Sequence, residues 1–361
     1  MKLQFNLFFV VIFLFSFFQL TCKEEPIIPC NDCPSPSDTT SHNFTWQKYT
    51  WGGGGSSSIN DVAIINDTNI WVVGDINLPD SIAQDSHGHN RPRCIAHWNG
   101  KTWDLQYIAY MPPGSIGDSL SAKVNAIFAR DDHDIWIAAG YMFHYDGVKW
   151  TPHYNTDAEG STKIWGDNSG KLWCVGRNGS IIYYNGSNWQ KLQSGTTFNF
   201  QDIYGAKDSK TGEWEILALT AQYDTLPVQS QLFRIEGTAV SVAETFFKIY
   251  FSVWFEPGEK YYLSGDGILW KNKLSDASWV YNPMGTITNN TSGSIRGNNL
   301  NDVFISQLYL DVLHFNGASW LDYHNVIPGG FGSYSRIALK GNTMVAGGWI
   351  DQKAIVLLGK R

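Results

Sequence analysis

The hydrophobic pattern of this chain changes twice along its length. Residues 5–20 are almost wholly apolar, residues 23–43 are rich in Pro, Ser, Thr and Asp, and from residue 44 short apolar segments alternate with polar turns. Short apolar and aromatic segments bounded by Gly, Asn and Asp are typical of β-strands. The pattern predicts a signal peptide over 1–21, a tether over 22–43 and an all-β domain over 44–361.

Four hairpin-like segments repeat inside the β domain. Each has an aromatic strand, an Asn-Gly or Asp-Gly pair, two further residues and a Trp: HWNGKTW (97–103), HYDGVKW (144–150), YYNGSNW (183–189) and HFNGASW (314–320). Asn-Gly and Asp-Gly favour a type I′ turn, in which both central residues take positive φ. Each segment is therefore predicted to be a β-hairpin with Trp early in the returning strand.

A second motif precedes these hairpins, with an apolar–Trp–apolar core before a Gly. It occurs at 69–74, 134–140 and 171–176, and inner strands are expected before it at 59–64, 124–129 and 162–167. Four antiparallel strands per unit make a propeller blade. Weaker copies fill 200–281 and 334–360, and seven units give about 45 residues each. We predict a single seven-bladed propeller, with six or eight blades as alternatives.

The last predicted blade lacks an outer strand. Residues 44–49 (FTWQKY) read like the outer Trp strands at 188–193 and 102–107. An open sheet edge leaves backbone groups unpaired and invites aggregation. The N-terminal strand is therefore predicted to pair with the last blade and close the ring.

The apolar leader ends at Gln19-Leu20-Thr21-Cys22, which resembles a lipobox. The resemblance implies that Cys22 is acylated and holds the protein on a lipid bilayer. Lys23-Glu24-Glu25 is similar to the surface-export signal of lipoproteins in some Gram-negative lineages. We expect an outer-membrane lipoprotein that faces the cell exterior, with the periplasmic side as an alternative. An uncleaved signal anchor is the other interpretation of the leader.

The remaining cysteines divide by their surroundings. Cys30 and Cys33 form a C-x-x-C in the tether, without the βαβ context of a redox motif, and a local disulfide is favoured. Cys94 and Cys174 fall in separate apolar strands and are expected to be buried thiols.

The repeats resemble those of bacterial propellers with Asp-box-like or regulator-propeller-like repeats. The Asp/Asn-Gly-x-x-Trp half of the Asp-box pattern is present, as at Asp146-Gly147 and Trp150, and its leading Ser is replaced. Sialidases share this architecture and use several Arg residues. The inner strands here carry mainly Arg296 and Arg336, which disfavours glycosidase chemistry.

Charge and composition remove other classes of function. A net charge of −7 does not favour nucleic-acid binding. The acidic segments 131–134 and 167–170 lie where turns are expected, and the side chains of Asp and Asn commonly cap turns. We expect no metal and no cofactor, and we attribute the repeated Trp residues to packing between blades.

Four long connections supply the candidate binding site. They are 50–58, 75–93, 109–123 and 220–230, and the expected strand order places all four on one face. Long loops on a rigid scaffold are where binding residues usually lie. The candidate ligand-binding residues are Trp51, His87, His89, Arg91, Arg93, Tyr110 and Tyr223.

The leading hypothesis is a non-catalytic surface lipoprotein, expected to be monomeric, that binds a macromolecule or glycan through this face. The alternatives are a glycan-active hydrolase or lyase on a propeller scaffold, and a periplasmic scaffold or membrane-complex assembly factor. No catalytic residue is assigned. Two or more carboxylates with an Arg at the channel mouth would favour an enzyme, and an aromatic or polar face would favour binding.

Overall fold

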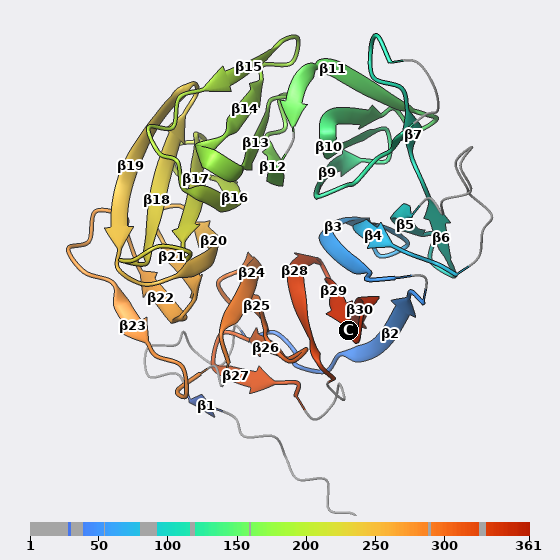
Figure 1. Ribbon diagram of the computed structural model, residues 1–361. Coiled ribbons are helices and arrows are strands. Elements are labelled where there is room, and N and C mark those ends of the chain that lie inside the picture. Colours follow the sequence, from blue (N-terminus) through green and yellow to red (C-terminus); the bar gives the residue numbers. More distant parts are fainter. Residues whose placement is uncertain are drawn as a thin grey trace, which may run out of the picture.

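The structure, a computed structural model, describes residues 28–29, 39–53, 55–79, 92–115, 120–158, 160–287, 290–324 and 330–361. Seven antiparallel sheets stand around a common axis, each with its first strand innermost (Figure 1). The predicted seven-bladed propeller is therefore confirmed. Within the described residues, no helix is long and apolar enough to cross a membrane.

The first three blades follow one another around the ring. Blade 1 contains β3 (Ser58–Asn66), β4 (Asn69–Ile76), β5 (Arg93–Trp98) and β6 (Trp103–Gln106). A short ribbon, β7 (Ala109–Tyr110) and β8 (Leu120–Ser121), leads to blade 2, which contains β9 (Ala126–Asp131), β10 (Asp134–Tyr145) and β11 (Trp150–Ala158). Blade 3 contains β12 (Ser161–Gly166), β13 (Leu172–Gly176), the 3-10 turn η2 (Arg177–Gly179), β14 (Ile181–Tyr184) and β15 (Trp189–Leu192).

The remaining blades complete the ring. Blade 4 contains β16 (Asn199–Lys207), β17 (Trp214–Gln222), β18 (Gln229–Glu236) and β19 (Ala239–Phe246). Blade 5 contains β20 (Tyr250–Glu256), β21 (Lys260–Gly265), β22 (Gly267–Lys271) and β23 (Val280–Asn282). Blade 6 contains β24 (Ser292–Asn299), β25 (Asp302–Gln307), β26 (Val312–Phe315) and β27 (Ser319–Asp322), with β1 (Ile28–Pro29) added at its edge. Blade 7 contains β28 (Gly332–Lys340), β29 (Thr343–Ile350), β30 (Lys353–Lys360) and β2 (Thr45–Trp51).

The N-terminal strand closes the ring as predicted. β2 pairs with β30 over seven residue pairs, from Thr45 opposite Lys360 to Trp51 opposite Ala354. Residues before β2 also contact the propeller, because the Thr40 N–H donates to the Asn316 carbonyl at 2.9 Å. Part of the segment with tether-like composition therefore lies against blade 6.

In blade 2 the single strand β10 supplies both the second and the third strand of the blade, so three labelled strands fill four positions. The Trp136 and His144 rings of β10 stack with centroids 4.4 Å apart, and the Asp134 carboxylate bonds His144 Nε2 at 2.9 Å. Eight residues of extended strand span more than about 25 Å, so these contacts require β10 to fold back. The turn is at Gly140, which has φ 81°.

The hairpin prediction is right in place but wrong in turn type. Only the glycine of each Asn-Gly or Asp-Gly pair has positive φ, as at Gly100 with 93° and Gly147 with 92°. The preceding Asn or Asp side chain instead accepts two backbone N–H groups, and Asn99 Oδ1 accepts those of Lys101 and Thr102 at 3.0 Å. The physical reason is an Asx turn, which the same two bonds form at Asp146, Asn185 and Asn316.

The repeated tryptophans hold the blades together, as predicted. Trp71 and Trp136 are each 4% exposed. The outer Trp150 of blade 2 packs against Trp71 of blade 1 at 6.2 Å, and the outer Trp189 of blade 3 packs against Trp136 at 5.6 Å. Cys94 and Cys174 are buried free thiols, as expected, and burial raises the pKa of each to about 12.

Candidate functional site

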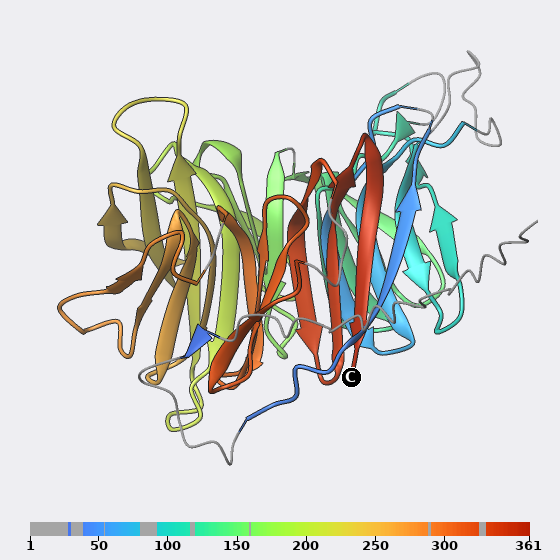
Figure 2. The same ribbon diagram turned by 90° about the horizontal axis from the view of Figure 1, so that it is seen from below.

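The long connections gather at one end of the propeller. β3 starts there, β4 returns there, and the same alternation in every blade brings the described parts of 50–58, 75–93, 109–123 and 220–230 to one face, which we call the long-loop face. Figure 2 shows this face at the top, with β1 and the chain leading into β2 on the opposite side. The opposite face carries the Asx turns, and we call it the turn face.

Charged side chains join the inner strands around the axis. Lys163 of β12 binds the Asp61 carboxylate of β3. Arg296 of β24 binds Asp202 of β16, with Nη2–Oδ1 at 2.7 Å and Nη1–Oδ2 at 2.9 Å. Both carboxylates are at most 1% exposed. These two pairs connect blades 1, 3, 4 and 6 across the centre of the ring.

Each buried carboxylate also accepts backbone N–H groups of the neighbouring blade. Asp61 Oδ2 accepts from Ile127 N at 3.0 Å, and Asp202 Oδ2 accepts from Val253 N at 3.1 Å. Burial alone would raise the pKa of Asp202, but the Arg296 guanidinium holds that pKa below its usual value. Both carboxylates are therefore occupied by structural bonds and offer a substrate no acid–base pair.

The inner strands surround a central channel along the propeller axis. The mouth of this channel opens on the long-loop face as a pocket of about 190 Å³. Two arginine residues line it, Arg336 from β28 and the exposed Arg177 from η2 between β13 and β14. Amide and hydroxyl side chains complete the lining, and none of its described residues is a carboxylate.

A larger cavity of about 440 Å³ lies where blade 1 passes into blade 2. We call it the aromatic groove, and it is lined by Tyr107, Ile108, Ala109, Tyr110, Met111, Phe143, Trp150, Pro152 and Tyr154. Tyr107, Met111 and Tyr154 are 43%, 47% and 36% exposed. None of these lining residues is charged.

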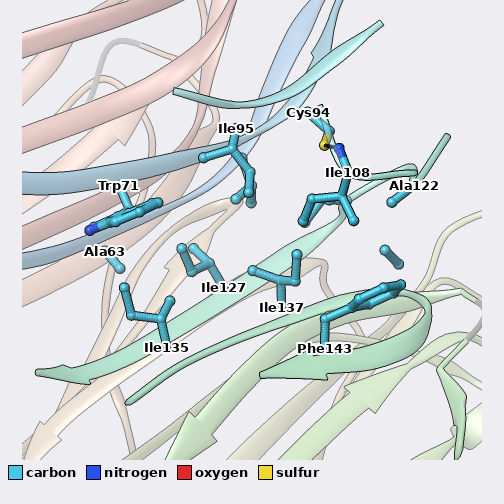
Figure 3. Close-up of a cluster of buried hydrophobic side chains, with 13 residues drawn as sticks. Ala63, Trp71, Cys94, Ile95, Ile108, Ala122, Ile127, Ile135, Ile137 and Phe143 are labelled. Atoms are coloured by element: carbon cyan, nitrogen blue, oxygen red, sulfur yellow. Dashed lines mark hydrogen bonds between the residues drawn. The ribbon is translucent and has the colours of Figure 1, made fainter. Parts of the chain in front are cut away.

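A rigid apolar cluster supports the groove. Ile108 and Phe143 belong both to the groove wall and to the buried cluster between blades 1 and 2 (Figure 3). The Ile108 N–H donates to Cys94 Sγ at 3.3 Å, which fixes the chain where it leaves blade 1. Tyr110 packs edge-on against Phe143 with centroids 5.4 Å apart. The groove wall is therefore preorganised.

A third cavity, of about 580 Å³, lies between the loops of blades 7 and 1 on the long-loop face. It combines Trp349 and the 70% exposed Phe331 with the carboxylates of Asp75 and Asp351. Burial raises the pKa of Asp75. A further cavity of about 200 Å³ lies at the other end of blade 4, beside the turn 208–213.

The candidate residues from the sequence fall in different surroundings. His87, His89, Arg91 and Cys22 lie outside the described residues. Trp51 packs edge-on against Trp103 in the seam between blades 7 and 1, at 5.5 Å. Tyr223 is 58% exposed in its loop on blade 4. Tyr110 lines the aromatic groove. Arg93 is not among the lining residues, but its guanidinium lies 5.6 Å from the centroid of the ring of Tyr107, which does line the groove.

The acidic turn of blade 2 is exposed. Asp131, Asp132 and His133 have ligand atoms within 4.8 Å of one another. Their bonds are those of a turn, since the Asp131 carboxylate accepts the His133 N–H at 2.9 Å and Asp132 contacts the His133 ring.

Comparison with known proteins supports the fold. No protein-family model and no curated protein matches the chain. A structure described as YCF48 bound to D1 peptide is 16% identical, with a TM-score of 0.62 and coverage of 93% of this chain and 98% of that chain. YCF48 from Cyanidioschyzon merolae is 12% identical, with a TM-score of 0.58 and coverages of 88% and 98%.

A structure of Chaetomium thermophilum Sqt1 bound to the N-terminus of the ribosomal protein L10 is 11% identical. Its TM-score is 0.54, and the match covers 86% of this chain and 98% of that chain. At these identities the likeness concerns the propeller fold alone.

Sequence reasoning did not find most of the aromatic groove. Tyr107 and Tyr110 stand out because they follow a blade at the start of a long connection. Phe143, Pro152 and Tyr154 come from the next blade, and their spacing resembles ordinary strand residues. The aromatic segment 141–145 could have indicated the second wall of the groove. A hairpin in this segment would place its aromatic residues beside the connection that leaves blade 1.

Proposed function

We propose that this protein is a non-catalytic binding protein that holds an extended segment of another polypeptide on its long-loop face. The aromatic groove carries the proposal. It offers a rigid apolar wall with exposed Tyr107, Met111 and Tyr154 at its opening. Preformed, mostly apolar cavities with aromatic anchors are typical of ligand sites, and aromatic residues contribute strongly where proteins bind one another.

The chemistry of the groove favours a peptide over a glycan. Sugar rings stack on aromatic faces, but their hydroxyl groups need several carboxylate, amide or charged partners. The described groove lining supplies tyrosine hydroxyls and no carboxylate or amide side chain. Apolar peptide side chains need only surface to bury, and Ile108, Met111 and Phe143 provide it. Two of the similar propellers hold peptides, one of D1 and one of the ribosomal protein L10.

The proposal includes anchoring through an acylated Cys22 in the outer membrane, with the binding face directed away from the bilayer. Thr40 and His42 dock on the turn face, where Thr40 Oγ1 donates to the Asn301 carbonyl at 2.6 Å and His42 contacts His314. A chain attached before these residues would approach the membrane with its turn face. The long-loop face would then be presented to partners outside.

The test uses peptide and glycan arrays probed with residues 39–361. We expect peptide spots with apolar or aromatic residues to retain the wild-type protein and to lose it after the double change Tyr107→Ala and Tyr154→Ala. Tyr281→Ala is the matched control, since Tyr281 is on an outer strand of blade 5 and is 36% exposed, as Tyr154 is. Retention by glycan spots alone, or equal effects of the two replacements, would contradict the proposal.

A further inference from the structure

The inner strands carry an unbalanced set of charges beside the channel mouth. Asp61 and Asp202 are the two carboxylates of the buried network, and Lys163, Arg296 and Arg336 are its three cations. Lys163 and Arg296 each bind a carboxylate. Among the described residues, Arg336 has no carboxylate within ion-pair distance, so the network carries one uncompensated positive charge.

Arg336 is held in place without being neutralised. Its Nη2 donates to the Gln201 carbonyl of blade 4 at 2.7 Å, and its Nη1 donates to the Ser335 carbonyl at 3.0 Å. Its Nε is buried and has no hydrogen-bond partner among the described atoms. A buried donor without a partner destabilises the folded protein. The guanidinium is therefore held by backbone carbonyls while its positive charge stays uncompensated.

The pocket above Arg336 is built for an oxygen acceptor. Arg177 provides a second cationic side chain, and Asn125, just before β9, and Ser335 of β28 provide polar side chains. The volume of about 190 Å³ admits a small group but not a folded element. The described lining has no carboxylate to repel an anion.

We propose that the channel mouth is a binding site for one carboxylate group, held between Arg336 and Arg177. The planar guanidinium fork matches a carboxylate, and Arg296 already binds Asp202 in this way within the same channel. A single negative charge balances the surplus of three cations over two carboxylates. The site is separate from the aromatic groove and does not depend on the peptide proposal.

The test is a titration of the protein labelled with ¹⁵N-arginine, monitored through the Arg336 Nε–H resonance. The probes are N-acetylglycine, its neutral analogue N-acetylglycinamide, and inorganic phosphate. We expect saturable shifts of this resonance with N-acetylglycine and none with the amide. Arg177→Ala should weaken N-acetylglycine binding by about tenfold, the usual effect of losing one charge-assisted hydrogen bond.

Lys191→Ala is the control, since it removes an exposed cation from the outer strand of the same blade. It should leave N-acetylglycine binding unchanged. Equal shifts with the amide, binding of phosphate without N-acetylglycine, or equal affinities in the Arg177→Ala and Lys191→Ala proteins would overturn the proposal. The assignment of the resonance is checked by its loss in Arg336→Lys.

Discussion

Arg296 of blade 6 binds Asp202 of blade 4 through two parallel hydrogen bonds of 2.7 and 2.9 Å, although blade 5 lies between them. The contact is possible because Ser252 of blade 5 is small and donates to the same carboxylate at 2.5 Å. The inner strands beneath the long-loop face are therefore joined by hydrogen bonds across the ring as well as between neighbouring blades.

This tie predicts a large stability loss when one partner is removed. Arg296→Met leaves the buried Asp202 carboxylate without its cation and should lower the free energy of unfolding by about 3 kcal/mol or more. Arg234→Met is the control, because Arg234 is 40% exposed in its pair with Glu215 and should cost roughly 1 kcal/mol or less. Urea unfolding of both variants measures the difference, and equal losses would contradict the role of the channel pair.

Ring closure predicts a sharp boundary in a truncation series. A chain starting at Thr39 loses, among the described residues, only the two-residue strand β1 from the propeller and should unfold at nearly the same temperature as a chain starting at Cys22. A chain starting at Gly52 loses all of β2, with the aromatic rings of Trp46, Tyr49 and Trp51, and exposes the edge of β30. A large apolar side chain contributes roughly 1.5–3 kcal/mol when fully buried. These three rings are half-buried, and their joint loss together with the β2–β30 pairing should lower the melting temperature steeply.

A third chain in the same series, starting at Phe44, keeps β2 but loses the contacts of Thr40 and His42 with blade 6. Its melting temperature should lie between the other two. Equal melting temperatures for the chains starting at Thr39 and Gly52 would refute closure as a source of stability.

The docked His42 predicts that acid destabilises the protein. Burial, together with the nearby His314 and Arg361, lowers the pKa of His42 from 6.5 to about 4 in the folded state. Between these values the unfolded chain binds more protons, so stability rises with pH and is lost as pH falls from 6.5 towards 4. The pKa of the buried His314 is lowered too, which acts in the same direction.

Urea unfolding near pH 7 and near pH 5 tests this dependence. The loss of stability on acidification should be smaller in His42→Gln than in the wild type. Identical pH dependences of the two proteins would show that His42 does not contribute.

The resemblance to a lipobox predicts acylation at Cys22. Cys22→Ser should abolish acyl labelling and release the protein from membranes, while the melting temperature of its propeller stays unchanged. Cys94→Ser is a control, since Cys94 is buried and free, and it should leave acylation and membrane retention intact. Membrane retention of the Cys22→Ser protein, with no acyl label on the wild type, would indicate an uncleaved signal anchor.

The blade pattern could be predicted from the sequence because each blade repeats the same local chemistry. An Asn or Asp that closes its own turn, and a Trp that packs on the preceding blade, recur at fixed spacing in blades 1, 2, 3 and 6. Closure also followed, since one blade lacked a strand and residues 44–49 matched the missing one. The turn type was wrong because the side chain of the Asn or Asp, rather than its backbone, satisfies the turn.

The sites were harder to predict because their residues come from different blades. Asp202 and Arg296 are 94 positions apart, and a single charge in an apolar strand does not indicate its partner. Tyr107 and Tyr154 likewise line one groove only when two neighbouring blades are placed side by side. The sequence indicated the long-loop face, but the shape of its cavities depends on packing that no repeat pattern contains.

The most direct test of the central claim is hydrogen–deuterium exchange of the propeller with and without a peptide selected on the array. We predict slower exchange in segments 107–111, 141–145 and 150–154, which contribute residues to the aromatic groove, and unchanged exchange in the turn-face segments 208–213 and 316–319. Slower exchange confined to the turn face, with 107–111, 141–145 and 150–154 unaffected, would contradict binding through the long-loop face.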